Sequence, residues 1–306
     1  MRLLHGDCLE KMAEIEDGSV DLVLADPPYG TTLCPWDSII PLEPMWDHLR
    51  RVIKPNGVIV MTASQPFTTT LIASNMPMFK YCWVWEKSIP SQFNLCNKRV
   101  MKWHEDVVVF HSSRPLSRPV YNPQFTSGRR NHSKGGAVGK PCGPAHFGSM
   151  LHYAADTHTT MKHPKSVIRI ANPRIKNQHP TQKPVELMEY LIKTYTNEGG
   201  TVLDFAMGSG TTGVACANLN RSFIGIERDD LFYQRASDRL AAVSATQAPA
   251  EPPPPDAAQA SLPLAPLPPH GFHKHVSPLA HGREAMSAGV PHGAVGSGRV
   301  GAVGDV

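Results

Sequence analysis

The sequence predicts an open α/β fold built on a doubly wound, mainly parallel β-sheet. Apolar runs of strand length alternate with segments of helical spacing on both sides of a long irregular segment. Two of these runs end abruptly at turns that carry an acid, Asp26 before two prolines and Asp204 before a glycine-rich turn. Because ligands bind at the carboxyl edge of an open parallel sheet, both turns are candidate parts of a functional site.

The expected elements of the first part follow from apolar periodicity and from turn residues. The run Val20–Ala25 reads as a buried strand that ends at prolines, which cannot donate to a β-ladder. The other expectations are strands at 2–5, 58–61, 79–86 and 105–110, helices at 7–16, 42–53 and 66–76, and a turn at 54–57.

The periodicity dissolves over residues 111–165, which are rich in Gly, Pro, Ser, His and basic residues. A loop this long inside a compact domain is usually functional or disordered. Order returns at Pro184, with helices expected at 185–195, from 211 and at 229–243, and strands at 201–204 and 222–227. From about Ala245 the composition shifts to Pro, Ala, Gly and His, which predicts a disordered tail.

The positive charge of the chain is concentrated in one segment. From His111 to Lys176 there are eleven Lys or Arg residues against one acid, Asp156, a net charge of +10. The whole chain carries +4, so the remainder carries −6. A cationic patch on an otherwise acidic protein favours a polyanion partner, and an ordinary solvated basic loop is the alternative.

The length, the cysteine content and the hydropathy of the chain limit the classes of protein to which it can belong. A chain of 306 residues suits one large α/β domain or two small ones. The six cysteines contain no C-x-x-C pair, which favours reduced thiols over disulfides or zinc, and we expect no metal. No apolar run approaches the ~18 residues of a membrane span. These features predict a cytoplasmic protein without a membrane partner.

The turn Asp26-Pro27-Pro28-Tyr29 has the groups needed to activate an exocyclic amino group. An adenine or cytosine amino nitrogen is a poor nucleophile because its lone pair is delocalised into the ring. The Asp26 carboxylate and the Pro27 carbonyl can accept its two hydrogens, and the prolines hold the turn rigid. Tyr29 offers a face for a flipped-out base, a stacking interaction worth ~1–3 kcal/mol. A simple strand-ending turn is the alternative for this motif by itself.

The second turn predicts a nucleotide-containing cofactor. Gly208, Gly210 and Gly213 satisfy G-x-G-x-x-G, and Glu227 lies 19 residues after Gly208. This matches the dinucleotide fingerprint, so a nicotinamide or flavin enzyme is one alternative. However, Asp204 suits an ammonium and would oppose a pyrophosphate. S-adenosylmethionine needs an anion for its amino group, backbone donors for its carboxylate and an acid for its ribose, and this segment offers all three.

Together these motifs resemble the β-class amino-methylating (N6-adenine or N4-cytosine) DNA methyltransferases over about residues 2–243. In that family the D-P-P-Y motif precedes the target-recognition region, and an F-x-G-x-G cofactor motif comes last, at the place where this chain has Phe205-Ala206-Met207-Gly208-Ser209-Gly210. The segment Gly6-Asp7 resembles a family element whose acid lies near the adenine of the cofactor. The segment His179–Pro184 resembles the H-P-T-Q-K-P element of the family, whose Thr and Lys lie near the methionine part, which implies that position for Thr181 and Lys183. The resemblance implies a Rossmann-like, S-adenosylmethionine-dependent fold with a circularly permuted motif order and an inserted basic target-recognition region.

The resemblance also implies domains and site residues. It divides the chain into a catalytic half at 1–110, a target-recognition region at 111–176, a cofactor half at 177–244 and a tail at 245–306. It implies catalytic roles for Asp26, Pro27, Pro28 and Tyr29, and a cofactor site of Asp7, Thr181, Lys183, Asp204, Phe205, Gly208, Ser209, Gly210, Thr211, Thr212 and Glu227. Candidate DNA contacts are Arg129, Arg130, Lys134, Arg169 and Arg174.

In the family, aspartate as the first motif residue usually accompanies adenine N6, and serine accompanies cytosine N4. Asp26 therefore favours adenine in double-stranded DNA, methylated by base flipping and direct transfer from S-adenosylmethionine. A homodimer is an open option for the assembly. The alternatives are a cytosine-N4 enzyme, an RNA amino-methyltransferase, an NAD-dependent oxidoreductase and a catalytically silent DNA-binding protein.

Overall fold

The computed structural model describes residues 1–32, 34, 37–111, 118–129, 141–142, 150–151, 160–173 and 182–247. The chain separates into two compact units, Met1–Ala250 and Glu251–Val306, and every described residue belongs to the first. Candidate residues Arg130, Lys134, Arg174 and Thr181 lie outside the described residues.

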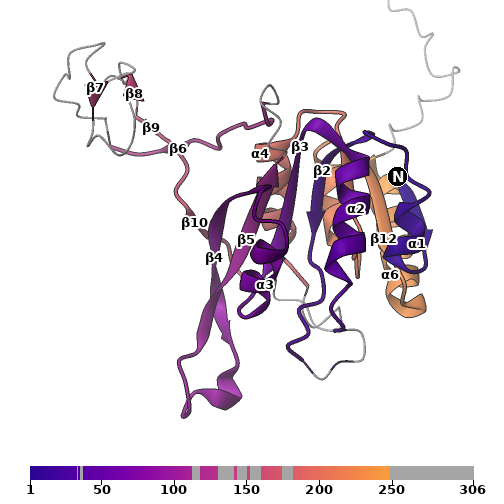
Figure 1. Ribbon diagram of the computed structural model, residues 1–306, viewed down its shortest axis with the longest axis horizontal. Coiled ribbons are helices and arrows are strands. Elements are labelled where there is room, and N and C mark those ends of the chain that lie inside the picture. Colours follow the sequence, from indigo (N-terminus) through magenta and orange to yellow (C-terminus); the bar gives the residue numbers. More distant parts are fainter. Residues whose placement is uncertain are drawn as a thin grey trace, which may run out of the picture. The chain divides into compact units, whose positions relative to one another are not determined.

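An eight-stranded sheet runs through the first unit in the order β1-β12-β11-β2-β3-β5-β4-β10 (Figure 1). Among these strands β5 is antiparallel to both of its neighbours, and the other pairs are parallel. The mainly parallel sheet is therefore confirmed. The strands are β1 Arg2–His5, β2 Val20–Ala25, β3 Ile53–Ala63, β4 Phe79–Ser91, β5 Lys102–His111, β10 Val167–Arg169, β11 Thr201–Asp204 and β12 Ser222–Glu227.

Helices cover both faces of this sheet, which confirms the doubly wound arrangement. Successive side chains of β2 point to opposite faces. Leu22 and Leu24 pack in one core cluster with side chains of α4, α5 and α6, and Val23 packs in a second cluster with side chains of α1, α2 and α3. The helices are α1 Cys8–Met12, α2 Leu42–Val52, α3 Phe67–Ser74, α4 Val185–Tyr195, α5 Thr211–Asn218 and α6 Asp230–Gln247.

The segment that lacks periodicity contains only short strands in its described parts. The strand β6 (Thr126–Ser127) pairs with β9 (Met161–Lys162), and β7 (Pro141–Cys142) pairs with β8 (Met150–Leu151), both antiparallel. Two-residue strands are too short to produce an alternating pattern, so the sequence could not reveal them.

Several expected boundaries differ from the structure: for example, the helix expected at 7–16 spans only Cys8–Met12, and the strand expected at 58–61 spans Ile53–Ala63. The turn expected at 54–57 lies inside β3, where Lys54 Nζ donates to Asp21 Oδ2 at 2.7 Å and the register with β2 shifts. A bulged strand can carry the glycine and asparagine that read as a turn. Helix α6 continues to Gln247, beyond the end expected at 243. None of the helices among the described residues is long and apolar enough to span a membrane.

The strand order places the two candidate turns side by side. Strands β11 and β2 pair directly, with Leu203 opposite Val23, so Asp204 and Asp26 follow neighbouring strands at the same edge. The sheet grows in opposite directions from this pair, towards β12 and β1 on one side and β3 on the other. This is the topological switch point at which open α/β sheets bind ligands.

Candidate active site

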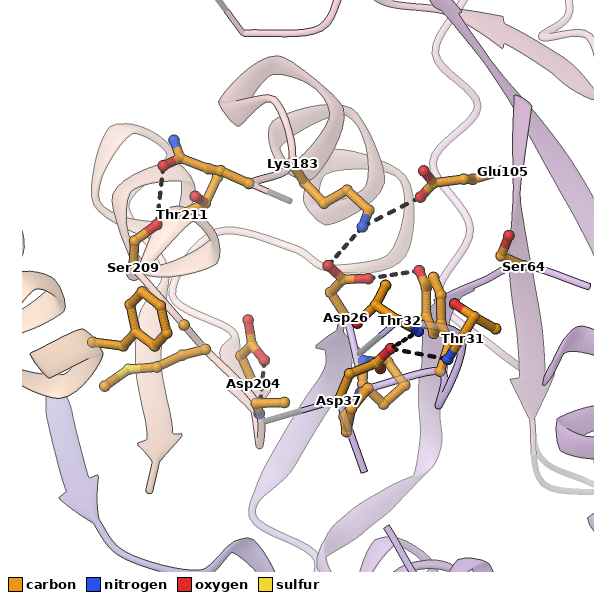
Figure 2. Close-up of a pocket in the computed structure, with 18 of the residues that line it drawn as sticks. Asp26, Thr31, Thr32, Asp37, Ser64, Glu105, Lys183, Asp204, Ser209 and Thr211 are labelled. Atoms are coloured by element: carbon orange, nitrogen blue, oxygen red, sulfur yellow. Dashed lines mark hydrogen bonds and ion pairs between the residues drawn. The ribbon is translucent and has the colours of Figure 1, made fainter. Parts of the chain in front are cut away.

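A cavity of about 710 Å³ opens at this switch point, and Figure 2 shows part of its lining. Both sequence motifs contribute to its wall, Asp26 to Tyr29 from the end of β2 and Asp204 to Ser209 from the end of β11. The volume lies in the range of about 300–1,000 Å³ that is typical of small-molecule sites. The fold therefore unites two motifs that are far apart in the chain.

The Asp26 carboxylate is held by three side chains. Oδ1 accepts hydrogen bonds from the hydroxyls of Tyr29, at 2.7 Å, and Thr62, and Oδ2 accepts one from Lys183 Nζ at 2.6 Å. A carboxylate offers about four acceptor positions, so these bonds fix its orientation and leave room for one more donor. Thr62 is fully buried on β3 and was missed by sequence reasoning, because nothing marks one threonine in a buried strand as functional.

Lys183 belongs to a row of alternating buried charges. Its Nζ lies 3.3 Å from Glu105 Oε2 (Figure 2). The other Glu105 oxygen lies 3.1 Å from Lys87 Nζ. The Lys183 and Lys87 side chains are only 7% and 4% exposed. Burial by itself lowers the pKa of Lys183, but Asp26 and Glu105 outweigh it and raise that pKa above its ordinary value. Lys183 is therefore a cation at neutral pH.

The family resemblance implies that Lys183 lies near the methionine part of the cofactor, and the structure adds a contact with the catalytic turn. Lys183 lines the cavity, but its hydrogen-bond partner in the structure is the catalytic carboxylate. Glu105 and Lys87 were not among the candidate residues. Each stands at the edge of a β-rich run beside other polar residues, so no sequence signal singled them out. These neighbours are Glu86 and Ser88 for Lys87, and His104 and Asp106 for Glu105.

The Tyr29 ring already has an aromatic neighbour. It stacks on Phe67 of α3, with ring centroids 5.4 Å apart and an angle of 21° between the planes. Lys183 Nζ lies 5.6 Å from the Tyr29 ring centroid. Burial raises the pKa of Tyr29 well above its usual range, as does the charge of Asp26, so the hydroxyl stays protonated and donates to Asp26.

Asp37 anchors the backbone that follows the catalytic turn. Its carboxylate accepts hydrogen bonds from the amides of Gly30, Thr31 and Thr32 at 2.8, 2.9 and 2.7 Å (Figure 2). Burial tends to raise the pKa of Asp37, but these hydrogen bonds lower it overall. Gly30 has a φ of +64°, a conformation that favours glycine. Sequence reasoning missed Asp37, which contacts the turn from seven residues further along the chain.

Asp204 is a buried acid at the end of β11. Its Oδ1 accepts from the Ala206 amide at 3.1 Å, and its Oδ2 accepts from the Thr212 hydroxyl at 2.6 Å. Burial raises the pKa of Asp204 to about 7, despite these hydrogen bonds. A cation bound beside it would favour the ionised form. This is the electrostatic environment that an ammonium group of a ligand would complete.

The glycine turn bridges β11 and α5. Gly208 and Gly210 have φ values of +51° and +76°, which favour glycine at both positions. The Gly208 amide donates to Glu227 Oε2 at 2.9 Å, and Asp229 donates to the other Glu227 oxygen at 2.9 Å. Glu227 is thus fixed at the end of β12, on the cavity wall, with acceptor positions left for hydroxyl groups.

Gln182 provides a test of whether the cavity fits S-adenosylmethionine. Its Oε1 accepts from the Ser209 hydroxyl at 3.0 Å, whereas its buried Nε2 has no hydrogen-bond partner among the described residues. A buried donor without a partner is costly, and a ligand carboxylate would satisfy it. With Asp204 for an ammonium and Glu227 for a ribose, the residues fit this cofactor. Gln182 was missed, although it stands inside the H-P-T-Q-K-P element.

The remaining candidate residues have varied surroundings. Asp7 and Thr211 line the cavity, and Asp7 also caps α1 through the Leu9 amide at 2.8 Å. Phe205 is buried in the core and also lines the cavity, and it precedes Gly208 by three residues rather than the two of F-x-G-x-G. Arg129 is exposed. Arg169 is 80% exposed, and its Nε donates to Glu86 at 2.7 Å.

Comparison with known proteins places the chain among DNA-modifying enzymes. A model of the DNA methylase family matches residues 20–238. The chain is 28% identical over 263 residues to the type II methyltransferase M2.LlaDCHI of Lactococcus lactis subsp. cremoris, covering 78% of this chain and 88% of that protein. It is 27% identical over 271 residues to M2.DpnII of Streptococcus pneumoniae, covering 80% and 91%.

Solved structures agree with this family. An M1.HpyAVI–SAM complex is 26% identical with a TM-score of 0.53, and the match covers 78% of this chain and 99% of that one. The cytosine-N4-specific PvuII DNA methyltransferase shares the fold, with a TM-score of 0.54 at 16% identity, over 79% and 90% of the two chains. The cofactor-bound relative favours S-adenosylmethionine over the nicotinamide alternative. The family model covers more than half of the chain, which therefore belongs to the DNA methylase family of amino-methylating, S-adenosylmethionine-dependent DNA methyltransferases.

Proposed function

We propose that the enzyme methylates N6 of adenine in double-stranded DNA, with Asp26 as the residue that receives the amino group. The observation that carries the proposal is Asp26 itself, an aspartate where cytosine-N4 enzymes usually have serine. Its carboxylate is oriented by three side chains and lines the cavity. These contacts support a preformed acceptor for an amino group.

Asp26 and the Pro27 carbonyl have complementary tasks in the reaction. Each accepts one hydrogen of the adenine amino group, which favours a tetrahedral nitrogen whose lone pair is available. S-adenosylmethionine, when bound, supplies an activated methyl group. The product nitrogen carries a positive charge until it releases a proton to water. The Asp26 carboxylate, paired with Lys183, stabilises that charge, and positioning supplies much of the remaining acceleration.

The target base has to leave the duplex to reach Asp26. An amino group inside a base stack cannot enter a cavity at the edge of a sheet, so the nucleotide is flipped into it. Pro27, Pro28 and Tyr29 form one part of the cavity wall. The Tyr29–Phe67 pair provides an aromatic platform on that side, where a base could stack.

The cofactor would occupy the part of the cavity formed by β11, β12 and the residues before α4. We assign the ammonium to Asp204, the carboxylate to the Gln182 amide and the ribose to Glu227. Asp7 lies at the end of β1, next to β12, where it lines the cavity near the position proposed for the adenine. Thr181 and Lys183 remain proposed for the methionine part.

Residues 111–176 remain the proposed target-recognition region, with Arg129 and Arg169 as its described candidates. Their guanidinium groups would contact phosphates or guanine edges, and the two contacts have different signatures. A phosphate contact weakens binding to every sequence, whereas a base contact relaxes specificity at one position.

Sequencing the DNA of a methylation-free bacterial host that expresses the enzyme tests the proposal. We expect N6-methyladenine at one recurring sequence, and no modification with Asp26→Asn, which retains the size of the side chain. N4-methylcytosine in its place would overturn the adenine assignment and leave the family intact. Methylation by Asp26→Asn at the wild-type rate would contradict the mechanism. Light scattering of the same enzyme tests the working hypothesis of a homodimer.

A further inference from the structure

The β4–β5 hairpin, Ser88–Trp103, has a tip that the proposed chemistry does not use. In Figure 1 it projects beyond the rest of the sheet and ends in a short 3-10 helix, Phe93–Leu95. The strands pair as far as Ser91 and Lys102. The hairpin residues Gln92, Leu95 and Arg99 line the same cavity as Asp26. The hairpin therefore forms the rim over which a DNA nucleotide would enter.

The hairpin combines exposed apolar side chains with positive charge. Phe93 is 72% exposed and Val100 is 89% exposed. Lys98, Arg99 and Lys102 give the segment Ser88–Trp103 a charge of +3, because it contains no acid. Apolar groups projecting among cations match the chemistry of a nucleic acid, which offers stacked bases between phosphates.

Backbone hydrogen bonds hold the tip in a defined shape. The amides of Leu95 and Cys96 donate to the carbonyls of Gln92 and Phe93 at 2.9 and 3.1 Å. The Lys98 and Arg99 amides both donate to the Leu95 carbonyl, at 2.8 and 3.0 Å. Phe93 is thus presented from a compact turn rather than from an extended loop. A preorganised projection loses little conformational freedom when it inserts into a partner.

We propose that the hairpin is a second DNA-binding element, in which Phe93 inserts into the base stack beside the target nucleotide. The inference rests on the base flipping proposed above. A flipped nucleotide leaves a gap in the stack, and an aromatic ring fills such a gap and opposes its closure. Lys98 and Arg99 follow Phe93 by five and six residues on the same hairpin and neutralise phosphates near the gap.

The test compares Phe93→Ala with Met76→Ala in the full-length enzyme. Met76 is a matched control because it is 56% exposed but precedes β4, at the opposite end of that strand from the hairpin tip. Each variant is assayed on an unmethylated duplex that contains the recognition sequence of the enzyme. The second substrate is the same duplex with an abasic site opposite the target nucleotide. The abasic duplex already lacks the pairing that insertion would break.

We expect Phe93→Ala to lower kcat/KM at least tenfold on the paired duplex, with unchanged S-adenosylmethionine affinity and melting temperature. On the abasic duplex its rate should recover to within threefold of wild type. Equal losses on both duplexes, or behaviour like that of Met76→Ala, would overturn the proposal. A changed oligomeric state with normal activity would assign the tip to a second protein copy and also overturn it.

The charged part of the proposal has its own measurement. Replacing Lys98 and Arg99 by alanine should reduce the slope of log Kd against log salt by about one for each lost phosphate contact. Lys193→Ala, on the exposed side of α4, is the control and should leave the slope unchanged. An unchanged slope in the hairpin variant would refute the phosphate contacts. The identity of the base that the wild-type enzyme methylates tests the proposed function separately.

Discussion

We expect Asp204 to make the affinity for S-adenosylmethionine depend on pH near neutrality, a range that is unusual for an aspartate. Burial raises its pKa to about 7 in the cofactor-free protein, with smaller contributions from Asp26 and Glu227. The proposed ammonium contact requires the ionised form. Because Asp204 takes up a proton as the pH falls below about 7, the cofactor should bind progressively more weakly in acid.

The expected size follows from the ionised fraction. For a group with a pKa of 7, that fraction falls from about three quarters at pH 7.5 to about 3% at pH 5.5, so Kd should rise about 25-fold. In Asp204→Asn this dependence should disappear. A lost charged hydrogen bond of about 1.5–3 kcal/mol should also weaken binding about ten- to hundredfold at pH 7.5.

Isothermal titration calorimetry measures both effects. Near pH 6.5, wild-type binding should release part of a proton, visible as a heat that varies with the ionisation enthalpy of the buffer. Asp230→Asn removes the same charge from an exposed site outside the cavity, and should behave like wild type. An equal affinity at pH 5.5 and 7.5, with the protein folded, would refute the assignment of Asp204 to the ammonium.

The free energy of unfolding of the cofactor-free protein should also depend on pH, because folding raises the pKa of Asp204. The raised pKa of Asp204 stabilises the folded state below about pH 4, and this contribution is lost as the pH rises through about 7. Asp204→Asn should therefore flatten the pH dependence of unfolding between those values, and increase the free energy of unfolding at pH 8. Urea denaturation across this range provides the comparison, and an unaltered profile would contradict the buried-acid account.

Three further predictions concern the surrounding structure. Glu105→Gln should cost about 3 kcal/mol in urea denaturation, because Lys87 and Lys183 lose the carboxylate between them; a cost below about 1 kcal/mol would argue against the buried row. Thr62→Val should lower kcat about tenfold in radiolabel transfer and leave cofactor affinity unchanged, since it removes one hydrogen bond to Asp26. Gly210→Ala should lower the melting temperature more than Gly199→Ala: both glycines have similar φ values, but only an added Cβ at Gly210 meets a neighbour, Ala236 Cβ at 3.1 Å. Equal shifts would assign the cost to backbone strain alone.

Local sequence patterns were sufficient to predict the bounds of some elements and several motif residues of this protein. The strand Val20–Ala25 and the helix Val185–Tyr195 have the bounds expected from the sequence. The apolar spacing and the neighbouring prolines that define these two elements are local features of the sequence, so the elements can be predicted without knowledge of tertiary contacts. The motif residues Asp26, Asp204 and Glu227 were also found this way, because each stands at the end of a buried strand.

Tertiary structure decided how those motifs act together. The pairing of β11 with β2 brings Asp204 to the same edge as Asp26, and the sequence contains no local sign of that register. The row of charges from Lys87 through Glu105 and Lys183 to Asp26 joins four separate segments. Periodicity reports only which face of an element is apolar. The partner of a buried charge depends on which elements pack together, and that is a property of the folded chain.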